Sequence, residues 1–417
     1  MIKIIDAKNF EYTHIKNSAP DVTETVKKIL EDVKTNGDKA VIEYEKKFDG
    51  IELNSLEVSQ SEKDEALKAV GSDFIKILER AAKNIFEFHS KQVRNGFSFS
   101  NKDGVILGQR IIPLERVGLY IPGGTASYPS SVLMNAIPAK IAGCKEIFIA
   151  TPPKIKSEII AAAEVAGVNK IFKMGGAQAV AALAYGTESV KRVDKISGPG
   201  NIFVAEAKRQ VFGQVSIDMI AGPSEILIIA DENNNPAFIA ADMLAQAEHD
   251  KLASAILITD SKIFAEKVSC EIENQIQNLI RKDIARTSID TNGKIILVEN
   301  LEDAIKISNG IAPEHLELCV DNPFEWLTEG KIKNAGSVFL GKNSPEALGD
   351  YYAGPNHTLP TMGTARFSSP LSVDDFVKKS QFIFYTREAL NKVSDDIAKF
   401  AQSEGLTGHA NSVLIRN

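Results

Sequence analysis

The sequence predicts an α/β protein with two incomplete Rossmann-like parallel-sheet domains, a helical N-terminal extension and a small C-terminal domain. Short apolar runs alternate with helical patterns from about residue 113 to residue 220, and a second series of the same kind runs from residue 225 to residue 340. Such β-α-β-α alternation is typical of a parallel sheet flanked by helices. The chain has 417 residues, which at roughly 150 residues per domain is enough for about two to four domains.

Four segments follow from this pattern. Residues 1–112 are mostly helical, and we expect them to pack on the second α/β domain. A first amphipathic helix is expected to end at Asn36–Gly37, and a second pattern, from about residue 61 to residue 93, is interrupted near Gly71. Ser72 or Asp73 is the expected cap of the helix that follows Gly71. The last three segments are the first domain (residues 113–222), the second domain (223–366) and a C-terminal segment (367–417) with one strand and a helical pattern.

Composition excludes several classes of function. The hydrophobic content of 44% and charged content of 25% are typical of a soluble globular protein. A net charge of −7 without a long basic run argues against a nucleic-acid partner. The three cysteines, Cys144, Cys270 and Cys319, are scattered and form no disulfide framework or cysteine-based zinc site. Charges near the N-terminus and the lack of an apolar run of about 20 residues predict a cytoplasmic protein with no membrane span.

Three glycine-rich turns follow predicted strands of the first domain. They are residues 120–124 (YIPGG), 174–178 (MGGAQ) and 197–201 (SGPGN). Glycine lets backbone amides approach a phosphate closely, and a helix N-terminus favours an anion, so three such turns indicate a nucleotide-sized ligand. The dinucleotide fingerprint is incomplete because Phe203 stands in place of its third glycine, although Asp218 is suitably spaced to bind a ribose hydroxyl. Ordinary tight turns explain each loop taken alone at least as well.

A glutamate and a histidine stand side by side in residues 311–318 (IAPEHLEL). Pro313 predicts a turn, from which the chain leaves through an apolar strand at residues 316–320. A turn allows both Glu314 and His315 to face one cleft. Histidine titrates near neutral pH and can pass protons, while the glutamate can orient it or activate water. The alternative, a surface pair ahead of an edge strand, is equally open on this stretch alone.

Four of the six histidines stand close in sequence to polar residues of the kind that bind ligands, whereas His14 and His89 receive no role. Histidine, aspartate and a neutral oxygen donor suit zinc or a similar divalent ion. No HExxH motif is present, which argues against a zincin-type protease. Spacing alone does not show that these distant residues meet. The candidates, besides His315, are Gln246 and His249 on one predicted helix, Asp350 and His357 in a polar loop, and His409.

Long motifs in one order, over nearly the whole chain, resemble the histidinol dehydrogenase family. No site position departs from the family pattern. The matching stretches are residues 120–124 (YIPGG), 197–201 (SGPGN), 221–225 (AGPSE), 246–249 (QAEH), 312–317 (APEHLE), 344–351 (SPEALGDY), 354–361 (GPNHTLPT) and 404–409 (EGLTGH).

The resemblance implies a zinc-containing homodimer, with one zinc per subunit, that oxidises L-histidinol to L-histidine through L-histidinaldehyde with two NAD, in the last steps of histidine biosynthesis. Residues 367–417 become a dimerisation segment that carries His409 into the neighbouring subunit's site. By motif position the zinc ligands are Gln246, His249, Asp350 and His409, with the substrate's own nitrogens completing the shell. The implied further substrate residues are Ser224, His357 and Glu404, and the implied NAD residues are Tyr120, Gln178 and Asn201.

The same resemblance gives the adjacent pair its roles. His315 takes the hydroxyl proton as hydride leaves and acts again on the hydrated aldehyde, and Glu314 activates the water between the two steps. Zinc orients the substrate more than it polarises the reacting oxygen. Cys319 lies nearby but at the far end of the predicted strand, where a buried, inert thiol is the commoner case.

Three other functions remain open from the sequence. A related zinc- and NAD-dependent dehydrogenase would oxidise a different small alcohol to an acid, and His357 and Glu404 decide between the two. A zinc hydrolase would use Glu314 on a metal-bound water, but it leaves the glycine loops without purpose. A non-catalytic nucleotide-binding protein leaves the glutamate-histidine pair and the metal-type residues unexplained.

Overall fold

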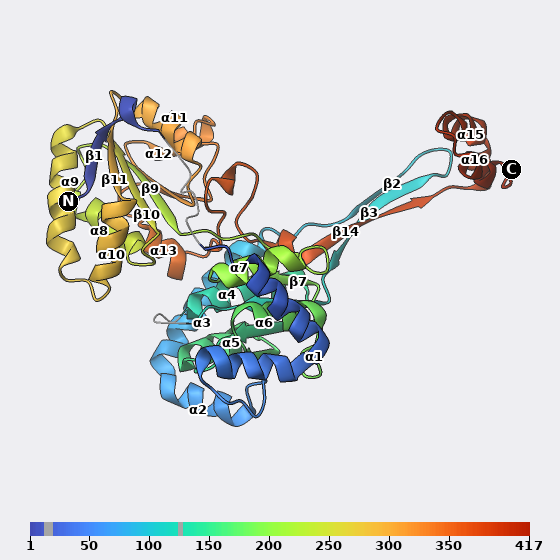
Figure 1. Ribbon diagram of the computed structural model, residues 1–417. Coiled ribbons are helices and arrows are strands. Elements are labelled where there is room, and N and C mark those ends of the chain that lie inside the picture. Colours follow the sequence, from blue (N-terminus) through green and yellow to red (C-terminus); the bar gives the residue numbers. More distant parts are fainter. Residues whose placement is uncertain (12–19, 124–127) are drawn as a thin grey trace.

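The computed structural model describes residues 1–11, 20–123 and 128–417, and it consists of two α/β domains and a projecting arm (Figure 1). The sheet of the first domain is parallel, with strand order β6-β5-β4-β7-β8. Its strands are nearly continuous apolar runs because helices bury both faces. They are β4 (Arg116–Tyr120), β5 (Glu146–Thr151), β6 (Lys170–Lys173), β7 (Lys195–Ser197) and β8 (Ser216–Ile217).

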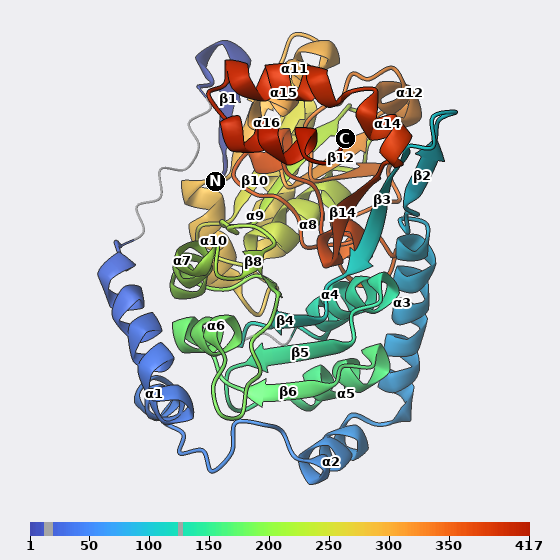
Figure 2. The same ribbon diagram turned by 90° about the vertical axis from the view of Figure 1, so that its right-hand side faces the viewer.

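The N-terminal helices pack on this first domain, so the prediction that they pack on the second is wrong (Figure 2). The apolar stripe of α1, which includes Val26 and Val33, shares one core with Phe148 and Phe172 of the sheet. An amphipathic stripe shows which face of a helix is buried but not which domain covers it. The helices of this domain are α1 (Thr23–Asp49), α2 (Gln60–Val70), α3 (Ser72–Ser90), α4 (Pro129–Ala142), α5 (Ser157–Ala166), α6 (Gly176–Tyr185) and α7 (Ile202–Val211).

Gly37 does not end the first helix as predicted, because α1 resumes after it and continues to Asp49, whereas Gly71 does interrupt the second pattern. Gly37 has a φ of 56° and a ψ of −136° inside α1, which breaks the helical path there. Gly71, with a φ of 78°, separates α2 from α3 and is itself the residue before α3. The predicted side-chain cap at Ser72 or Asp73 is wrong, because no side chain caps α3.

The second sheet is also parallel, with strand order β1-β11-β10-β9-β12-β13. Apart from β1, which the N-terminal segment contributes, this order repeats that of the first sheet when strands are numbered within each domain. Both domains therefore have the Rossmann-like arrangement that the sequence predicts. The strands are β1 (Lys3–Asp6), β9 (Glu225–Ala230), β10 (Ser254–Thr259), β11 (Lys294–Leu297), β12 (His315–Cys319) and β13 (Ser337–Leu340).

Helices cover both faces of the second sheet, whose strands β9 and β10 have no exposed residue. The α-helices are α8 (Pro236–Ala247), α9 (Lys262–Ile276), α10 (Lys282–Thr291), α11 (Leu301–Ile311), α12 (Pro323–Thr328) and α13 (Glu346–Tyr351). Short 3-10 helices are η1 (Ala7–Asn9), η2 (Thr364–Arg366) and η3 (Val373–Phe376).

An arm extends away from both domains and carries the C-terminus at its tip (Figure 1). Its shaft is the antiparallel sheet β14-β3-β2, in which β3 is the central strand. Its surface exposes many large apolar side chains, including Phe97, Phe99, Phe384, Phe400 and Ile415. Among the described residues, no helix is long and apolar enough to cross a membrane. The arm comprises β2 (Phe97–Ser100), β3 (Ile106–Pro113), β14 (Val377–Phe384), α14 (Arg387–Asn391), α15 (Ser394–Ser403) and α16 (Thr407–Leu414).

Candidate active site

A cavity of about 1020 Å³ lies where the two α/β domains meet. The first domain contributes residues that follow the carboxyl ends of β4 and β7, including Gly123 and Asn201. The second contributes the opposite edge of its sheet, because His315 is the first residue of β12. The rule that ligands bind beyond the carboxyl ends of parallel strands thus holds for the first domain only. The predicted residues Ser224, His249, Glu314, His315, Asp350 and His357 all line this cavity.

A backbone carbonyl fixes the protonation pattern of His315. Its Nδ1 lies 2.9 Å from the main-chain oxygen of Glu225. A carbonyl oxygen only accepts hydrogen bonds, so Nδ1 carries the hydrogen and Nε2 of the neutral ring has a free lone pair. Nε2 has no hydrogen-bond partner within the described part of the chain. Burial lowers the pKa of His315, which keeps the ring neutral and able to accept a proton.

Glu314 lies beside this ring, in the turn that joins α11 to β12. Ala312 ends α11 in the left-handed conformation, at a φ of 53°, and Pro313 prevents the helix from continuing. Glu314 Oε2 accepts a hydrogen bond of 2.8 Å from the backbone amide of Glu225 and lies 3.7 Å from His315 Nδ1. The exposed fractions of Glu314 and His315 are 6% and 4%, so the surface-pair alternative is wrong. Burial raises the pKa of Glu314 well above its usual value.

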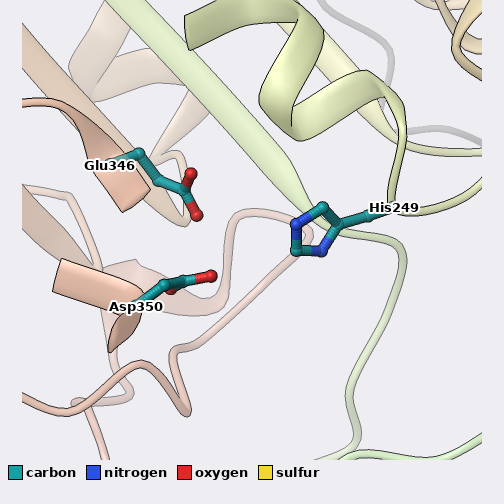
Figure 3. Close-up of side chains that lie close together, drawn as sticks. All are labelled: His249, Glu346 and Asp350. Carbon is teal, nitrogen blue, oxygen red and sulfur yellow. The ribbon is translucent and has the colours of Figure 1, made fainter. Parts of the chain in front are cut away.

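A compact group of potential metal ligands adjoins the pair. The imidazole of His249 faces the carboxylates of Glu346 and Asp350, with one ligand atom from each residue within 4.8 Å of the others (Figure 3). Gln246, in the last turn of α8, is fully buried, and neither its amide oxygen nor its amide nitrogen has a hydrogen-bond partner among the described residues. A buried amide without partners is costly, and a cation bound to its oxygen would satisfy it. This donor set fits zinc.

Glu346 and Glu225 were given no role from the sequence, yet both support the site. Glu346 Oε1 lies 3.7 Å from His315 Nε2, and burial together with the charge of Asp350 raises the pKa of Glu346 to about 10. Burial also raises the pKa of Glu225 to about 7. Both residues lie in stretches that carry the family resemblance, residues 221–225 and 344–351, and Glu346, like Glu314, follows a proline.

Two predicted site residues lie elsewhere in this chain. Glu404 follows α15 and His409 is on α16, so both are at the tip of the arm, far from the cavity (Figure 1). Both side chains are exposed to solvent. The chain by itself therefore brings together His249 and Asp350 but not His409.

Two of the three predicted NAD residues are outside the lining of the cavity. Tyr120 is buried, and its hydroxyl accepts a hydrogen bond from the amide of Gly176. Gln178 is also buried and donates to Glu45. Asn201 does line the cavity, where its side-chain oxygen caps α7. Gly124 of the first glycine loop lies outside the described residues.

A carboxylate of the chain binds one backbone amide in each of the other two glycine loops. Glu45 accepts a hydrogen bond of 2.9 Å from Gly175 at the N-terminus of α6. Asp218 accepts one of 2.7 Å from Gly198 and forms a buried ion pair with Lys208. These two amides are therefore engaged within the chain. Asp218 lines the cavity, but its carboxylate already binds Gly198 and Lys208, so its role toward a ribose stays a prediction. Only the structure reveals such internal anions, because Glu45 is remote in sequence from its loop.

The carboxyl of Glu45 makes stability depend on pH. Burial raises its pKa from 4.5 to about 7, so the folded state binds this proton more tightly than the unfolded state, and stability falls as the pH rises through this range. We expect Glu45→Gln to raise the melting temperature by about 2–4 °C at about pH 8 and by less at about pH 5. Thermal denaturation of both proteins at the two pH values measures this. Glu43→Gln, an exposed change on the same helix, is the control, and equal shifts for Glu45→Gln at both pH values would contradict the assignment.

Comparison with known proteins identifies the family. The family model described as histidinol dehydrogenase matches residues 13–417. The chain belongs to the histidinol dehydrogenase family. It is 56% identical over 400 residues to a histidinol dehydrogenase of Clostridium acetobutylicum, covering 95% of this chain and 92% of that one. Identity to a histidinol dehydrogenase of Listeria monocytogenes is also 56%, over 403 residues, which cover 96% of this chain and 94% of the relative.

Solved structures agree with this family assignment. The crystal structure of histidinol dehydrogenase from Elizabethkingia anophelis superposes with a TM-score of 0.92 at 40% identity, covering 100% of this chain and 98% of that one. An acetylating aldehyde dehydrogenase from Geobacillus thermoglucosidasius gives a TM-score of 0.51 at 14% identity, covering 88% of this chain and 99% of that one. The second likeness shows a common fold alone. In this chain Cys319 is buried at the end of β12, as predicted, and burial raises the pKa of its thiol well above the usual range.

Proposed function

We propose that this chain is a cytoplasmic histidinol dehydrogenase that oxidises L-histidinol to L-histidine through L-histidinaldehyde, in the last steps of histidine biosynthesis. The observation that carries the proposal is the neutral ring of His315, which lines the cavity together with His249 and Asp350 and whose buried Nε2 has no hydrogen-bond partner among the described residues. The family supports the reaction, and this geometry supports a proton-transfer role for His315 in it.

Zinc would be held by Gln246, His249 and Asp350, with His409 of the partner subunit as the fourth protein ligand. A bound zinc ion supplies an anchor that holds the substrate in one orientation. The carboxylate of Glu346 lies beside that of Asp350 and would help to hold it in place. The orphaned amide of Gln246 is the feature of this chain that most favours a bound cation.

His315 performs the same proton transfer in both oxidations. NAD supplies the hydride acceptor for each of them. His315 Nε2 takes the hydroxyl proton of the alcohol, and in the second oxidation it takes a hydroxyl proton of the hydrated aldehyde. The Glu225 carbonyl holds the ring through Nδ1, so the orientation of Nε2 is the same in both steps. Asn201 supports a cofactor position on the first-domain side of the cavity, whereas binding by Tyr120 and Gln178 requires their buried side chains to become accessible.

Glu314 activates the water that converts the aldehyde to its hydrate. A carboxylate whose pKa is raised by burial is a stronger base when ionised. We expect Glu314→Gln to lower kcat for L-histidinaldehyde by about 10²-fold or more while impairing the alcohol step less. Single-turnover measurements of NADH formation from each substrate test this. Equal losses on alcohol and aldehyde would remove the water-activation role.

A homodimer completes the site in this proposal. The arm exposes a large apolar surface, which is costly in an isolated chain and typical of a protein interface. Its tip carries Glu404 and His409, both exposed and distant from their own cavity (Figure 1). Exchange of arms would place these two side chains in the partner's cavity, with Glu404 binding substrate and His409 binding zinc. Activity would then require the dimer.

The substrate assignment is tested by comparing alcohols. NADH absorbance is followed with L-histidinol and with other small amino alcohols under the same conditions. We expect kcat/KM for L-histidinol to exceed that for the others by roughly 100-fold or more, because a site that hydrogen-bonds specific groups rejects analogues lacking them. A higher value for a different alcohol would favour the related zinc- and NAD-dependent dehydrogenase. NADH formation from any alcohol would exclude the zinc hydrolase.

A further inference from the structure

A serine of the first domain reaches across the cavity to a histidine of the second. Ser131 lies in the first turn of α4 and lines the cavity. Its Oγ is 3.2 Å from Nε2 of His357, which lines the same cavity from the loop after α13. No role for Ser131 follows from the sequence motifs or from the reaction steps described above.

The direction of this hydrogen bond follows from the other nitrogen of His357. Nδ1 lies 3.1 Å from the backbone oxygen of Asp350. That oxygen can only accept, so Nδ1 carries the hydrogen of the neutral ring and Nε2 is an acceptor. Ser131 must therefore donate its hydroxyl proton to His357. The two lone pairs of Ser131 Oγ have no hydrogen-bond donor within the described part of the chain.

Buried polar contacts hold Ser131 rigidly against the second domain. Asn135, one turn further along α4, donates to the backbone oxygen of Ser131 and to the hydroxyl of Thr358. Asn356 donates to the backbone oxygen of Met134 at 2.6 Å. Ser131 is only 3% exposed, so its hydroxyl has little freedom to choose another partner. A hydroxyl fixed in this way is a preorganised acceptor.

We propose that Ser131 binds the substrate in the proposed dehydrogenase reaction, and that its Oγ accepts an N–H of the substrate's amino group. The inference rests on the proposed function. An acceptor needs a donor on the ligand, and L-histidinol offers its hydroxyl, the single N–H of its imidazole ring and its amine. The hydroxyl proton is taken by His315, and of the two nitrogen groups we assign the amine, because a contact to the ring N–H would affect L-histidinol and an analogue without the amine equally. An amine keeps N–H bonds even when its lone pair is bound to a cation. His357 then acts through Ser131, because its Nε2 is occupied by the serine proton.

The test compares two ligands on two proteins by calorimetry, using the zinc-loaded dimer without NAD. Imidazole propanol, which has the ring and the alcohol of L-histidinol but no amino group, is the second ligand. We expect Ser131→Ala to weaken L-histidinol binding by about 5- to 30-fold, as for the loss of a hydrogen bond to a polar group, and imidazole propanol binding by less than about 2-fold. Ser131→Thr, which keeps the hydroxyl, should restore L-histidinol binding to within about 3-fold of wild type.

Equal weakening of both ligands, or no weakening of L-histidinol, would overturn the inference. Ser157→Ala is the control, because Ser157 lies half-buried in the first turn of α5, outside the cavity lining, and should leave both affinities unchanged. If Ser131→Ala does not fold, Ser131→Cys keeps the volume with a much weaker polar group and should show the same selective loss. If the wild-type protein forms no NADH from L-histidinol, the proposed function itself is refuted. If it forms NADH but the calorimetric comparison shows no selective loss in Ser131→Ala, only the present inference fails.

The pairing of Ser131 with His357 has a second consequence. If His357 acts through Ser131, then His357→Ala and Ser131→Ala remove the same interaction and their effects on L-histidinol affinity will not add. We expect the double variant to bind within about 3-fold of the weaker single variant. Full additivity in the same calorimetric assay would show that His357 contacts the substrate independently.

Discussion

His315→Asn is expected to lower kcat for L-histidinol by about 10²- to 10⁴-fold, the range typical of losing a general base. Asparagine can still donate to the Glu225 carbonyl from the position of Nδ1, but it places no basic nitrogen at the position of Nε2. Substrate affinity should change little, because the substitution removes a proton acceptor rather than a binding group. Steady-state NADH formation and calorimetric binding of L-histidinol measure the two quantities separately.

The dependence of this effect on pH gives a further check. Burial lowers the pKa of His315, so in the wild-type protein the neutral ring persists to a lower pH than for an exposed histidine. The wild-type rate should fall only as the pH drops through that lowered pKa. The residual rate of the variant should not show this decrease at low pH. His89→Asn is the control, since His89 is buried, hydrogen-bonded to Gln92 and outside the cavity lining. A His315→Asn protein with kcat within about 3-fold of wild type would remove His315 as the base.

Mixing two inactive variants is expected to restore activity if the arm completes the partner's site. In the proposed dimer each site takes His315 from one chain and His409 from the arm of the other chain. When a His315→Asn chain pairs with a His409→Asn chain, one of the two sites therefore contains both substitutions and the other contains neither. Random pairing makes half of the dimers mixed, so the mixture should recover about a quarter of wild-type activity. The measurement is NADH formation after the two proteins are denatured and refolded together.

The control for this experiment uses two defects from the same contributor. His315→Asn and Glu314→Gln lie on adjacent residues of one chain, so every site of a mixed dimer keeps one defect and no activity should return. Zinc content gives a second readout, because His409→Asn alone should lose much of its metal. Absence of recovery in the His315→Asn and His409→Asn mixture, with dimers confirmed by light scattering, would contradict the shared site.

The sequence predicted the two sheets because buried parallel strands leave a strong apolar signal. It did not predict that β1 joins the second sheet while α1 packs on the first domain, because an amphipathic pattern does not show which domain covers the apolar face of a helix. The arm was missed for a related reason. Its shaft pairs β14 with β3 across more than two hundred residues of sequence, and such pairings have no local signature.

The site was predictable where chemistry is concentrated in short motifs. The Glu314–His315 pair and the polar residues His249 and Asp350 do lie on one cavity. Glu346 escaped notice because its importance comes from burial beside other carboxylates, which spacing does not reveal. Two of the three glycine loops contribute residues to the cavity lining, whereas Glu45 binds an amide of the remaining loop from a distant helix, which spacing does not reveal.

The central claim is that this chain oxidises its substrate twice at one zinc-dependent site, and the ratio of NADH formed to L-histidinol consumed tests it most directly. The ratio is measured on the purified protein before chelation, after chelation and after zinc is restored. The account predicts two NADH per L-histidinol, loss of activity on chelation and recovery with zinc, because an alcohol gives up two electrons in each of two steps. A ratio of one would show that the reaction stops at the aldehyde and would contradict the role of Glu314. An unchanged rate after complete removal of the metal would contradict the role of zinc.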